Sequence, residues 1–417
     1  MNVRLLLLPV IAVAVAACGV TPTPQPSLLP TSSPTATPAP TSPTPSIPTA
    51  AVNPLPSGSP ATMAVSTFPF PDSLDVVPGA PLTADDGHFY YPSPDGASVI
   101  AADWVSGATR RVVSVAAGHR VAGLAASGDW LIYLDGSTNG PPGKQATPCM
   151  SNYAEPFNWR IVALRLTTRE QVLVDSGVSR RTTPYPGNEV CPGPTAPMLA
   201  VSGSLVAYDR EDATASQPLR ERIVVRSLPG GSVVRQTETA RAVAGIAVFA
   251  GTSGSGPLVA YLEQHATGSA RLMLSSPGKP DGGEVTVGVE SAVLSRDASG
   301  IGRLTWVALD DQGESTIWSF TLGTDPVRID TGLHRGWTAL TADASRIVWG
   351  QVATDTDQPA PITVWDIGSG QITTIPTAIN VMRVWLTPGG WLAWAGDGLD
   401  VAGHIIKRGY AVKVSGP

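Results

Sequence analysis

Charged residues are scarce in this chain. Asp, Glu, Lys and Arg make up only 14% of the 417 residues, and none of them occurs between Gly19 and Pro71. The formal net charge is −6, so the chain has no excess of positive charge to offer a polyanion. Because nucleic-acid binding requires a basic face, we expect no nucleic-acid partner.

The sequence also lacks the spaced motifs of common catalytic and metal sites. Its five histidines are scattered, and it contains no HExxH, no Gly-x-Ser-x-Gly and no glycine-rich phosphate loop. We therefore predict no catalytic residue, no metal site and no cofactor, and the sequence favours a role without catalysis. An enzyme assembled from residues of a central funnel stays open as an alternative, because such a site carries no local motif.

Helical periodicity is missing as well. Beyond the first 17 residues, no segment of twelve or more repeats its apolar residues every 3.6 positions. Short runs rich in Val, Ile, Thr and Trp alternate instead with turns, and the chain has 43 glycines and 40 prolines. This pattern predicts an all-β fold.

The N-terminus has the features of an export signal. Arg4 precedes an apolar run of 13 residues, Leu5 to Ala17, which is shorter than the roughly 20 residues of a membrane-spanning helix. Small residues directly before Cys18 resemble the lipobox of bacterial lipoproteins. The resemblance implies that residues 1–17 are removed and that Cys18 carries acyl chains such as palmitate, which anchor the protein in a membrane. An ordinary secretory signal with an incidental Cys18 is the alternative.

The segment after the signal is dominated by Pro, Thr, Ser and Ala. An uncharged segment of this kind cannot bury enough apolar surface to offset the entropy lost on ordering. We therefore expect residues 18–63 to be a disordered tether and residues 64–417 to be the folded domain. The expected location is the cell membrane or cell envelope, outside the cytoplasm.

The folded part contains a sevenfold repeat. A small apolar segment, a turn and an apolar stretch that ends in an aromatic residue recur in this order along residues 64–417. Spacings between successive aromatics are 42, 75, 53, 45, 43 and 45 residues, mostly near the period of a four-stranded propeller blade. The aromatics are Tyr91, Tyr133, Tyr208, Tyr261, Trp306, Trp349 and Trp394. The sequence therefore predicts a seven-bladed β-propeller of four-stranded antiparallel blades.

Each repeat divides into two hairpins, and we expect its aromatic residue to pack in the core between blades. The last repeat has three strands before the chain ends at Pro417. The stretch from Ala64 to Val77 precedes the first repeat and can supply the missing strand. Such a pairing would close the ring and leave no open sheet edge.

Several turn motifs resemble those of TolB-type and WD-like bacterial propellers. They are Ser93-Pro94-Asp95-Gly96, Thr341-Ala342-Asp343-Ala344 and Trp365-Asp366-Ile367-Gly368. The resemblance covers about residues 64–417 and implies a propeller that serves as an interaction platform. We expect such a protein to be a monomer.

Two further cysteines, Cys149 and Cys191, follow the signal region. In a four-stranded meander, the loops between second and third strands share a rim with the connections between blades. Cys149 lies in a loop of the first kind and Cys191 in a connection of the second kind, beside the same blade. In an oxidising compartment we expect a disulfide between them. Two unpaired buried thiols are the alternative.

Aromatic residues near these cysteines are the candidate binding residues. Tyr153, Phe157, Trp159 and Tyr185 lie in or beside the two long loops and could form a contact patch. They could equally pack the loops onto the blade. The sequence thus favours an envelope-anchored scaffold that binds a protein or a glycan through its loop-rich rim. The alternatives are a hydrolase or lyase acting on an envelope polymer, and a structural factor in envelope assembly.

Overall fold

A computed structural model of the chain describes residues 65–414, except 78–79, 139–156, 180–195, 213–219, 240–242, 252–255, 265–269, 298, 310–313, 334–337, 353–360 and 401. The chain divides into two units, Met1–Pro48 and Thr49–Pro417, and every described residue belongs to the second. The expected signal peptide, Cys18 and the tether therefore lie outside the described residues.

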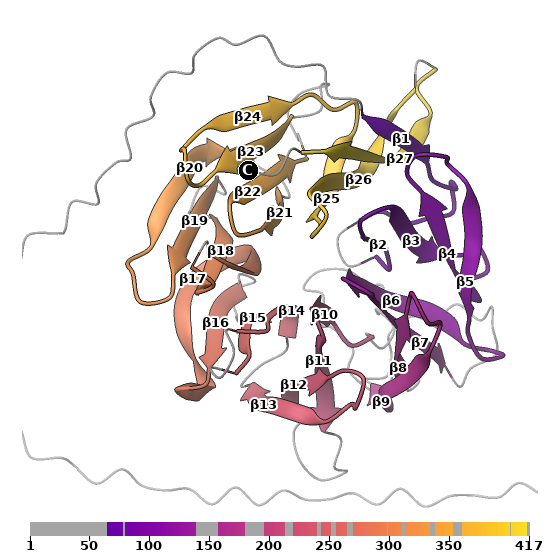
Figure 1. Cartoon of the computed structure of the whole chain (residues 1–417), viewed down its shortest axis with the longest axis horizontal. Coiled ribbons are helices and arrows are strands. Elements are labelled where there is room, and N and C mark those ends of the chain that lie inside the picture. The colour runs from indigo at the N-terminus through magenta and orange to yellow at the C-terminus, as the bar shows by residue number, and fades with distance from the viewer. Residues whose placement is uncertain are drawn as a thin grey trace, which may run out of the picture. The chain divides into compact units, whose positions relative to one another are not determined.

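The described residues form 27 strands. They contain no helix, and so no helix that could cross a bilayer. All strand pairs are antiparallel, and consecutive strands are neighbours in five sheets of four strands and one sheet of seven. Figure 1 shows these sheets set around a common centre within residues 65–414. The fold is therefore an all-β propeller built from antiparallel blades of the four-stranded type.

The first three four-stranded sheets follow one another along the chain, each beginning with its innermost strand. Their strands are β2 (Thr83–Ala84), β3 (His88–Pro92), β4 (Ser98–Asp103) and β5 (Thr109–Ser114); β6 (Arg120–Ser127), β7 (Trp130–Thr138), β8 (Phe157–Arg165) and β9 (Gln171–Ser179); and β10 (Leu199–Ser202), β11 (Leu205–Asp212), β12 (Arg220–Ser227) and β13 (Val233–Thr239).

The rest of the chain forms the seven-stranded sheet and two more sheets of four strands. The seven strands are β14 (Val243–Phe249), β15 (Leu258–Gln264), β16 (Ala270–Ser276), β17 (Lys279–Arg296), β18 (Gly302–Leu309), β19 (Ser315–Thr321) and β20 (Val327–Leu333). The next sheet is β21 (Thr338–Ala342), β22 (Arg346–Gln351), β23 (Ile362–Asp366) and β24 (Ile372–Ile375). The last combines β25 (Asn380–Leu386), β26 (Trp391–Leu399) and β27 (Ile405–Lys413) with β1 (Ser66–Pro69).

The expectation of seven separate four-stranded blades is met only in part. Strand β17 is 18 residues long and belongs to two hairpin series at once. It pairs with β16 as far as Val289 and with β18 from Val289 onward. The structure therefore has six sheets where the sequence period indicates seven, because one connection between successive repeats is a continuous strand and not a loop.

The predicted closure of the ring is confirmed. Strand β1 pairs with β27, with Ser66 opposite Ala411 and Pro69 opposite Arg408. Phe68 and the following Phe70 are buried in one cluster with residues of β3, β4 and β26. The start of the described chain thus completes the last blade and covers its edge strand.

The seven recurring aromatics are core residues, as the sequence analysis predicts. None of their side chains is more than 3% exposed. Each lies on the second strand of its repeat, namely β3, β7, β11, β15, β18, β22 or β26. Because both faces of a blade are covered by its neighbours, these large rings fill the space between blades.

Strand directions define two ends of the propeller. Strands β5, β7 and β9 finish at the end where β6, β8 and β10 begin, and we call this end the loop rim. The long stretches that contain Cys149 and Cys191 connect to β7, β8, β9 and β10 at the loop rim. Both cysteines lie outside the described residues, so their pairing stays a prediction.

Candidate functional site

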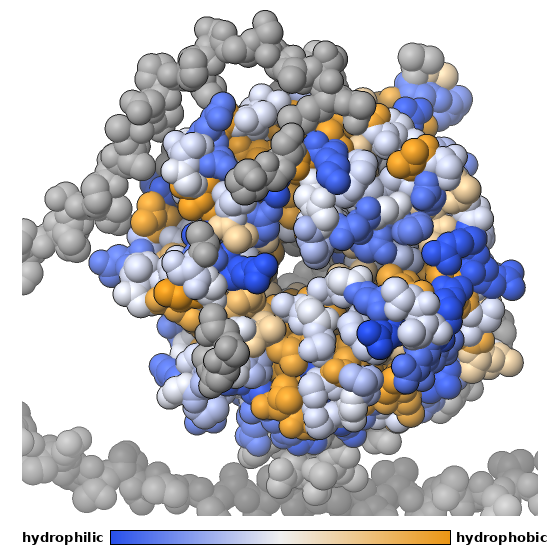
Figure 2. All heavy atoms as spheres, in the orientation of Figure 1, coloured by the Kyte–Doolittle hydropathy of each residue, from blue (hydrophilic) through white to orange (hydrophobic). Residues whose placement is uncertain are grey.

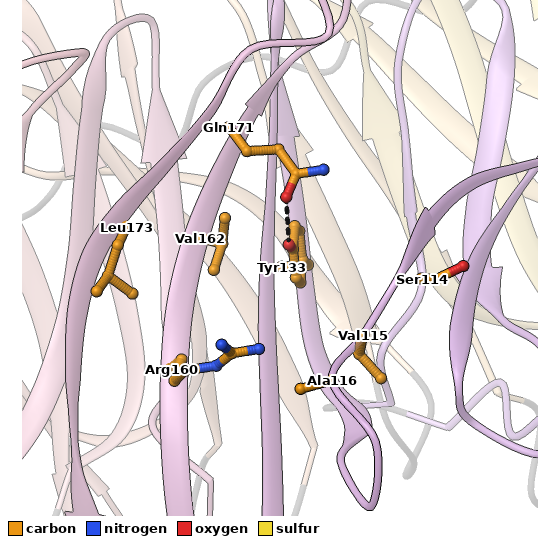
Figure 3. A pocket seen from close by; sticks show the side chains of 8 residues that line it. All are labelled: Ser114, Val115, Ala116, Tyr133, Arg160, Val162, Gln171 and Leu173. Carbon is orange, nitrogen blue, oxygen red and sulfur yellow. Dashed lines mark hydrogen bonds between the residues drawn. The ribbon is translucent and has the colours of Figure 1, made fainter.

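A groove lies between the end of β5 and the outer part of the β6–β9 blade. Its cavity volume is about 410 Å³. Figure 3 shows side chains of β7, β8 and β9 on one side and those of β5 and the residues after it on the other. The lining residues are Ser114, Val115, Ala116, Tyr133, Arg160, Val162, Gln171 and Leu173.

Beneath this groove, Asp135 joins two basic side chains. Asp135 on β7 is fully buried and lies directly opposite Arg160 on β8. Arg160 donates from Nε to Oδ1 at 3.0 Å and from Nη2 to Oδ2 at 2.7 Å. The Nδ1 atom of His119 lies 2.7 Å from Oδ1. Two-point contact with a carboxylate fixes the plane of the guanidinium, and the hydrogen bond to Asp135 raises the pKa of Arg160.

A second hydrogen bond orders the groove nearer its outer strand. The hydroxyl of Tyr133 donates to Oε1 of Gln171 on β9 at 3.2 Å, the contact drawn in Figure 3. Burial, together with the nearby charge of Asp135, raises the pKa of Tyr133 to about 12, so its phenol stays protonated at neutral pH. The amide nitrogen of Gln171 remains a donor for another group.

The groove also presents apolar surface. Leu173 is 58% exposed although it sits on a strand, and Val162 and Val115 lie beside it in the lining. Figure 2 shows hydrophilic residues gathered over the side of the ring that carries β5 to β9, with hydrophobic residues among them. A preformed groove with a few oriented polar groups and apolar walls is suited to binding.

The structure places two of the four candidate aromatics, and both are buried. Phe157 and Trp159 lie on β8 and are 9% and 2% exposed. The ring of Trp159 packs edge-on against Tyr208 at 6.2 Å, in the core cluster between two blades. Gly177 makes room for it, because a Cβ there would lie 2.4 Å from Trp159 Cζ2. In this arrangement the two side chains contribute to the core and not to an exposed patch.

Tyr153 and Tyr185, like Cys149 and Cys191, lie outside the described residues. Whether these tyrosines take part in binding therefore stays a prediction. The groove beside β9 is close in sequence to both of the stretches that contain them, since β8 and β9 flank those stretches.

Asp135 and its partners were not predicted from the sequence, although a weak signal is present in it. Asp135 follows the recurring aromatic Tyr133 by two positions, and Glu263 follows Tyr261 in the same way. Glu263 is 1% exposed and accepts a hydrogen bond from Nε of Arg271 at 2.9 Å on the adjacent strand. An acidic residue two positions after the aromatic thus marks a buried ion pair across the second and third strands in two repeats.

A smaller hollow, with a volume of about 130 Å³, lies between inner strands of the seven-stranded sheet. It is lined by β14, β15 and β17, and Glu290 of β17 is the only residue of its lining with an acidic or basic side chain. Oε1 of Glu290 accepts a hydrogen bond from the Thr338 amide at 3.2 Å. Burial raises the pKa of Glu290 to about 7, against the lowering effect of that hydrogen bond.

Comparisons with known proteins assign the chain to no family. No protein-family model and no curated protein matches the sequence. A chain of the mitotic checkpoint complex covers 88% of this chain and is itself covered to 97%, with a TM-score of 0.49 and 11% identity. TolB from Acinetobacter baumannii has a TM-score of 0.37 and 12% identity, and the alignment covers 80% of this chain and 79% of the TolB chain. Oligogalacturonate lyase from Vibrio parahaemolyticus has a TM-score of 0.36 and 11% identity, and the alignment covers 78% of this chain and 75% of the lyase chain.

Proposed function

We propose that this protein is a lipid-anchored propeller that works outside the cytoplasm and binds an envelope protein or glycan through its loop rim. The observation that supports this proposal best is the groove beside β9. There, oriented hydrogen-bonding groups and the exposed Leu173 meet on a rigid scaffold. We propose no chemical step, because the carboxylate beneath the groove is engaged by Arg160 and His119.

Preorganisation makes the groove suitable for a partner. Arg160 is held by both oxygens of Asp135, and Tyr133 is held by Gln171. Side chains that are already ordered lose little conformational entropy when a ligand binds, so more of the contact energy is available for affinity. The half-exposed Arg160 and the amide of Gln171 supply donors, while Leu173 supplies apolar contact area.

The position of the groove agrees with the expected role of the long loops. Ser114 ends β5 and Arg160 lies near the start of β8, both toward the loop rim, whereas Gln171 and Leu173 lie near the start of β9, toward the other end of the blade. The groove thus runs along the blade, and one of its ends lies near the loop rim. The stretches that contain Cys149, Tyr153 and Tyr185 attach at the same rim. Binding residues are commonly carried on loops that a rigid scaffold positions.

The anchor and the tether are proposed from the sequence. The apolar run Leu5 to Ala17 followed by Cys18 supports acylation, and the uncharged residues 19–71 support a flexible connection. Replacing Cys18 with alanine in the full chain is expected to release the protein from the membrane fraction. Continued sedimentation of the C18A protein with membranes, measured by fractionation and blotting, would refute the lipid anchor.

We also propose that the ring has seven blades. On this interpretation, β17 is the outer strand of one blade as far as Val289 and the inner strand of the next blade from there on. Its pairing with β16 and then β18 supports this division, as does the presence of seven buried aromatics on seven second strands. The connection between these two blades is then an extended segment of the same strand.

A site-specific photocrosslink tests the binding function. A photoreactive phenylalanine analogue is placed at Leu173 in the full chain, and at Val105, which is 82% exposed in the turn after β4, as a matched control. After illumination of intact cells, we expect a discrete adduct at position 173 and none at 105. Digestion of the adduct by protease or by glycan-degrading enzymes distinguishes the two partner classes. Equal yields at both positions, or no adduct at 173, would contradict the proposal.

A further inference from the structure

Glu290 occupies a position that the fold otherwise gives to uncharged residues. Four inner strands, β6, β14, β17 and β25, share a shift in register one or two residues after they begin to pair. In each case the residue skipped by the pairing sits at the bulge. These residues are Ala122, Ala244, Glu290 and Met382. The bulge therefore does not require a carboxylate, and the fold tolerates alanine there.

Only one of the two carboxylate oxygens of Glu290 accepts a hydrogen bond from the described residues. Its Oε1 atom accepts the amide hydrogen of Thr338, from the inner strand of the next sheet. Its Oε2 atom is buried and has no hydrogen-bond partner among the described residues. Thr338 is fully buried, and its Oγ1 atom is also without a partner in the described part of the chain. Unsatisfied buried polar atoms are uncommon in native proteins, and here two belong to residues in direct contact.

The wall of the hollow at Glu290 is mostly apolar, apart from Tyr261 and Ser291, whose hydroxyl donates to the Thr338 carbonyl at 3.4 Å. Alanine side chains from three strands form much of it, together with Leu262 and Ile246. Tyr261 is the other titratable residue of the lining, and burial raises the pKa of its phenol to about 12. On the same strand, Glu263 is already paired with Arg271. Within the described residues, no cation lines the hollow to balance an ionised Glu290.

We propose that this hollow binds a primary ammonium group carried on a short alkyl stem, with the ammonium at Glu290 Oε2 and the stem against the alanine side chains of the wall. An unpartnered carboxylate oxygen is an acceptor that an ammonium, with three N–H donors, can satisfy. The stem matches the apolar wall, where burial of methylene groups is favourable. A lysine side chain of a partner and a free alkylamine share this chemistry. The proposal does not depend on the groove beside β9.

Binding of the amine should depend on pH, because it is coupled to the ionisation of Glu290. A protonated Glu290 cannot pair with a cation, so binding requires the ionised carboxyl group and lowers its pKa. Since the pKa of Glu290 is raised to about 7, the site is mostly ionised above this pH. The affinity is expected to rise with pH and to be about 30-fold higher at pH 8.5 than at pH 5.5, because an amine stays protonated over this range.

The test measures binding of n-butylammonium chloride to the full chain by calorimetry at pH 5.5 and 8.5. We expect saturable binding by the wild type that strengthens with pH, and at least tenfold weaker binding by Glu290→Gln and Glu290→Ala. The alanine variant should fold, because Ala122 and Ala244 occupy the equivalent bulges. Glu170→Gln, at an exposed glutamate, is the matched control and should bind as the wild type does.

Two ligands separate the sources of the amine. 1-Butanol, which has the same stem without the charge, should not bind. A lysine-containing peptide and its acetylated form are then compared. Binding of the unmodified peptide alone supports a partner's side chain as the ligand, whereas binding of butylammonium without the peptide supports a diffusible amine. Absence of saturable amine binding, equal binding by the Glu290→Ala variant, or binding that weakens as pH rises would overturn the proposal.

Discussion

Replacing Phe70 with alanine is expected to lower the free energy of unfolding by about 3 to 5 kcal/mol, the usual cost of removing a buried phenylalanine ring. Phe70 is 5% exposed and packs edge-on against Phe68, Phe89 and Tyr91, with ring centroids 5.3 to 5.6 Å apart. Its amide also donates to the Lys407 carbonyl at 3.0 Å. The change keeps this backbone contact and should weaken the packing of the start of the folded domain against β3 of the first sheet.

Denaturant unfolding followed by tryptophan fluorescence measures this effect. Val65→Ala is the matched control, because Val65 lies just before β1 and is 39% exposed. Exposed substitutions of this kind usually change stability by less than about 0.5 kcal/mol. If the Phe70→Ala and Val65→Ala proteins unfolded at the same denaturant concentration, the N-terminal strand would not belong to the cooperative unit, and ring closure through β1 would contribute little.

Replacing Asp135 with alanine is expected to cost about 3 kcal/mol, the lower end of the range for breaking a buried ion pair. The change leaves Arg160 and His119 without the carboxylate that they share. Arg160 is 39% exposed and can turn partly to water, which places the expected cost at the lower end. The ordering of Arg160 in the groove should be lost with it, so the photocrosslink at position 173 should weaken as well.

An exposed ion pair provides the control for Asp135. Glu284 lies 3.5 Å from Arg271 and is 49% exposed, so Glu284→Ala should cost no more than about 1 kcal/mol. Both variants are compared with the wild type in urea at constant pH and ionic strength. The Asp135→Ala protein could instead be destabilised no more than the Glu284→Ala protein. That result would contradict the prediction, because the attraction within the buried pair would then do no more than balance the cost of removing its charges from water.

Much of the fold can be predicted from the sequence because its signals are local and periodic. Alternating apolar residues identify the strands, glycine and proline identify the turns, and the seven aromatics give the period. The three strands of the last repeat predict that an N-terminal segment completes its blade, and β1 does so. The joining of two repeats through β17 could not be predicted, because a continuous strand and a short turn differ little in composition.

The candidate binding residues and the groove are harder to predict from the sequence than the fold is. Phe157 and Trp159 stand out as aromatics near long loops, yet the structure buries both in one core cluster, with Trp159 packed against Tyr208. Whether an aromatic on a strand end faces the solvent or a neighbouring blade depends on the register of that strand. The groove depends in turn on the approach of β5 to β9, strands of two different sheets.

The sequence by itself determines the all-β class, the repeat, the buried aromatics and the closure of the ring, because each follows from residue types at regular spacing. Only the tertiary structure decides which polar groups meet. Asp135 finds His119 16 residues away and Arg160 25 residues away, whereas Oε2 of Glu290 finds no partner among the described residues. The physical reason is that the burial and pairing of a charged group depend on side chains brought together from several strands, which no local pattern encodes.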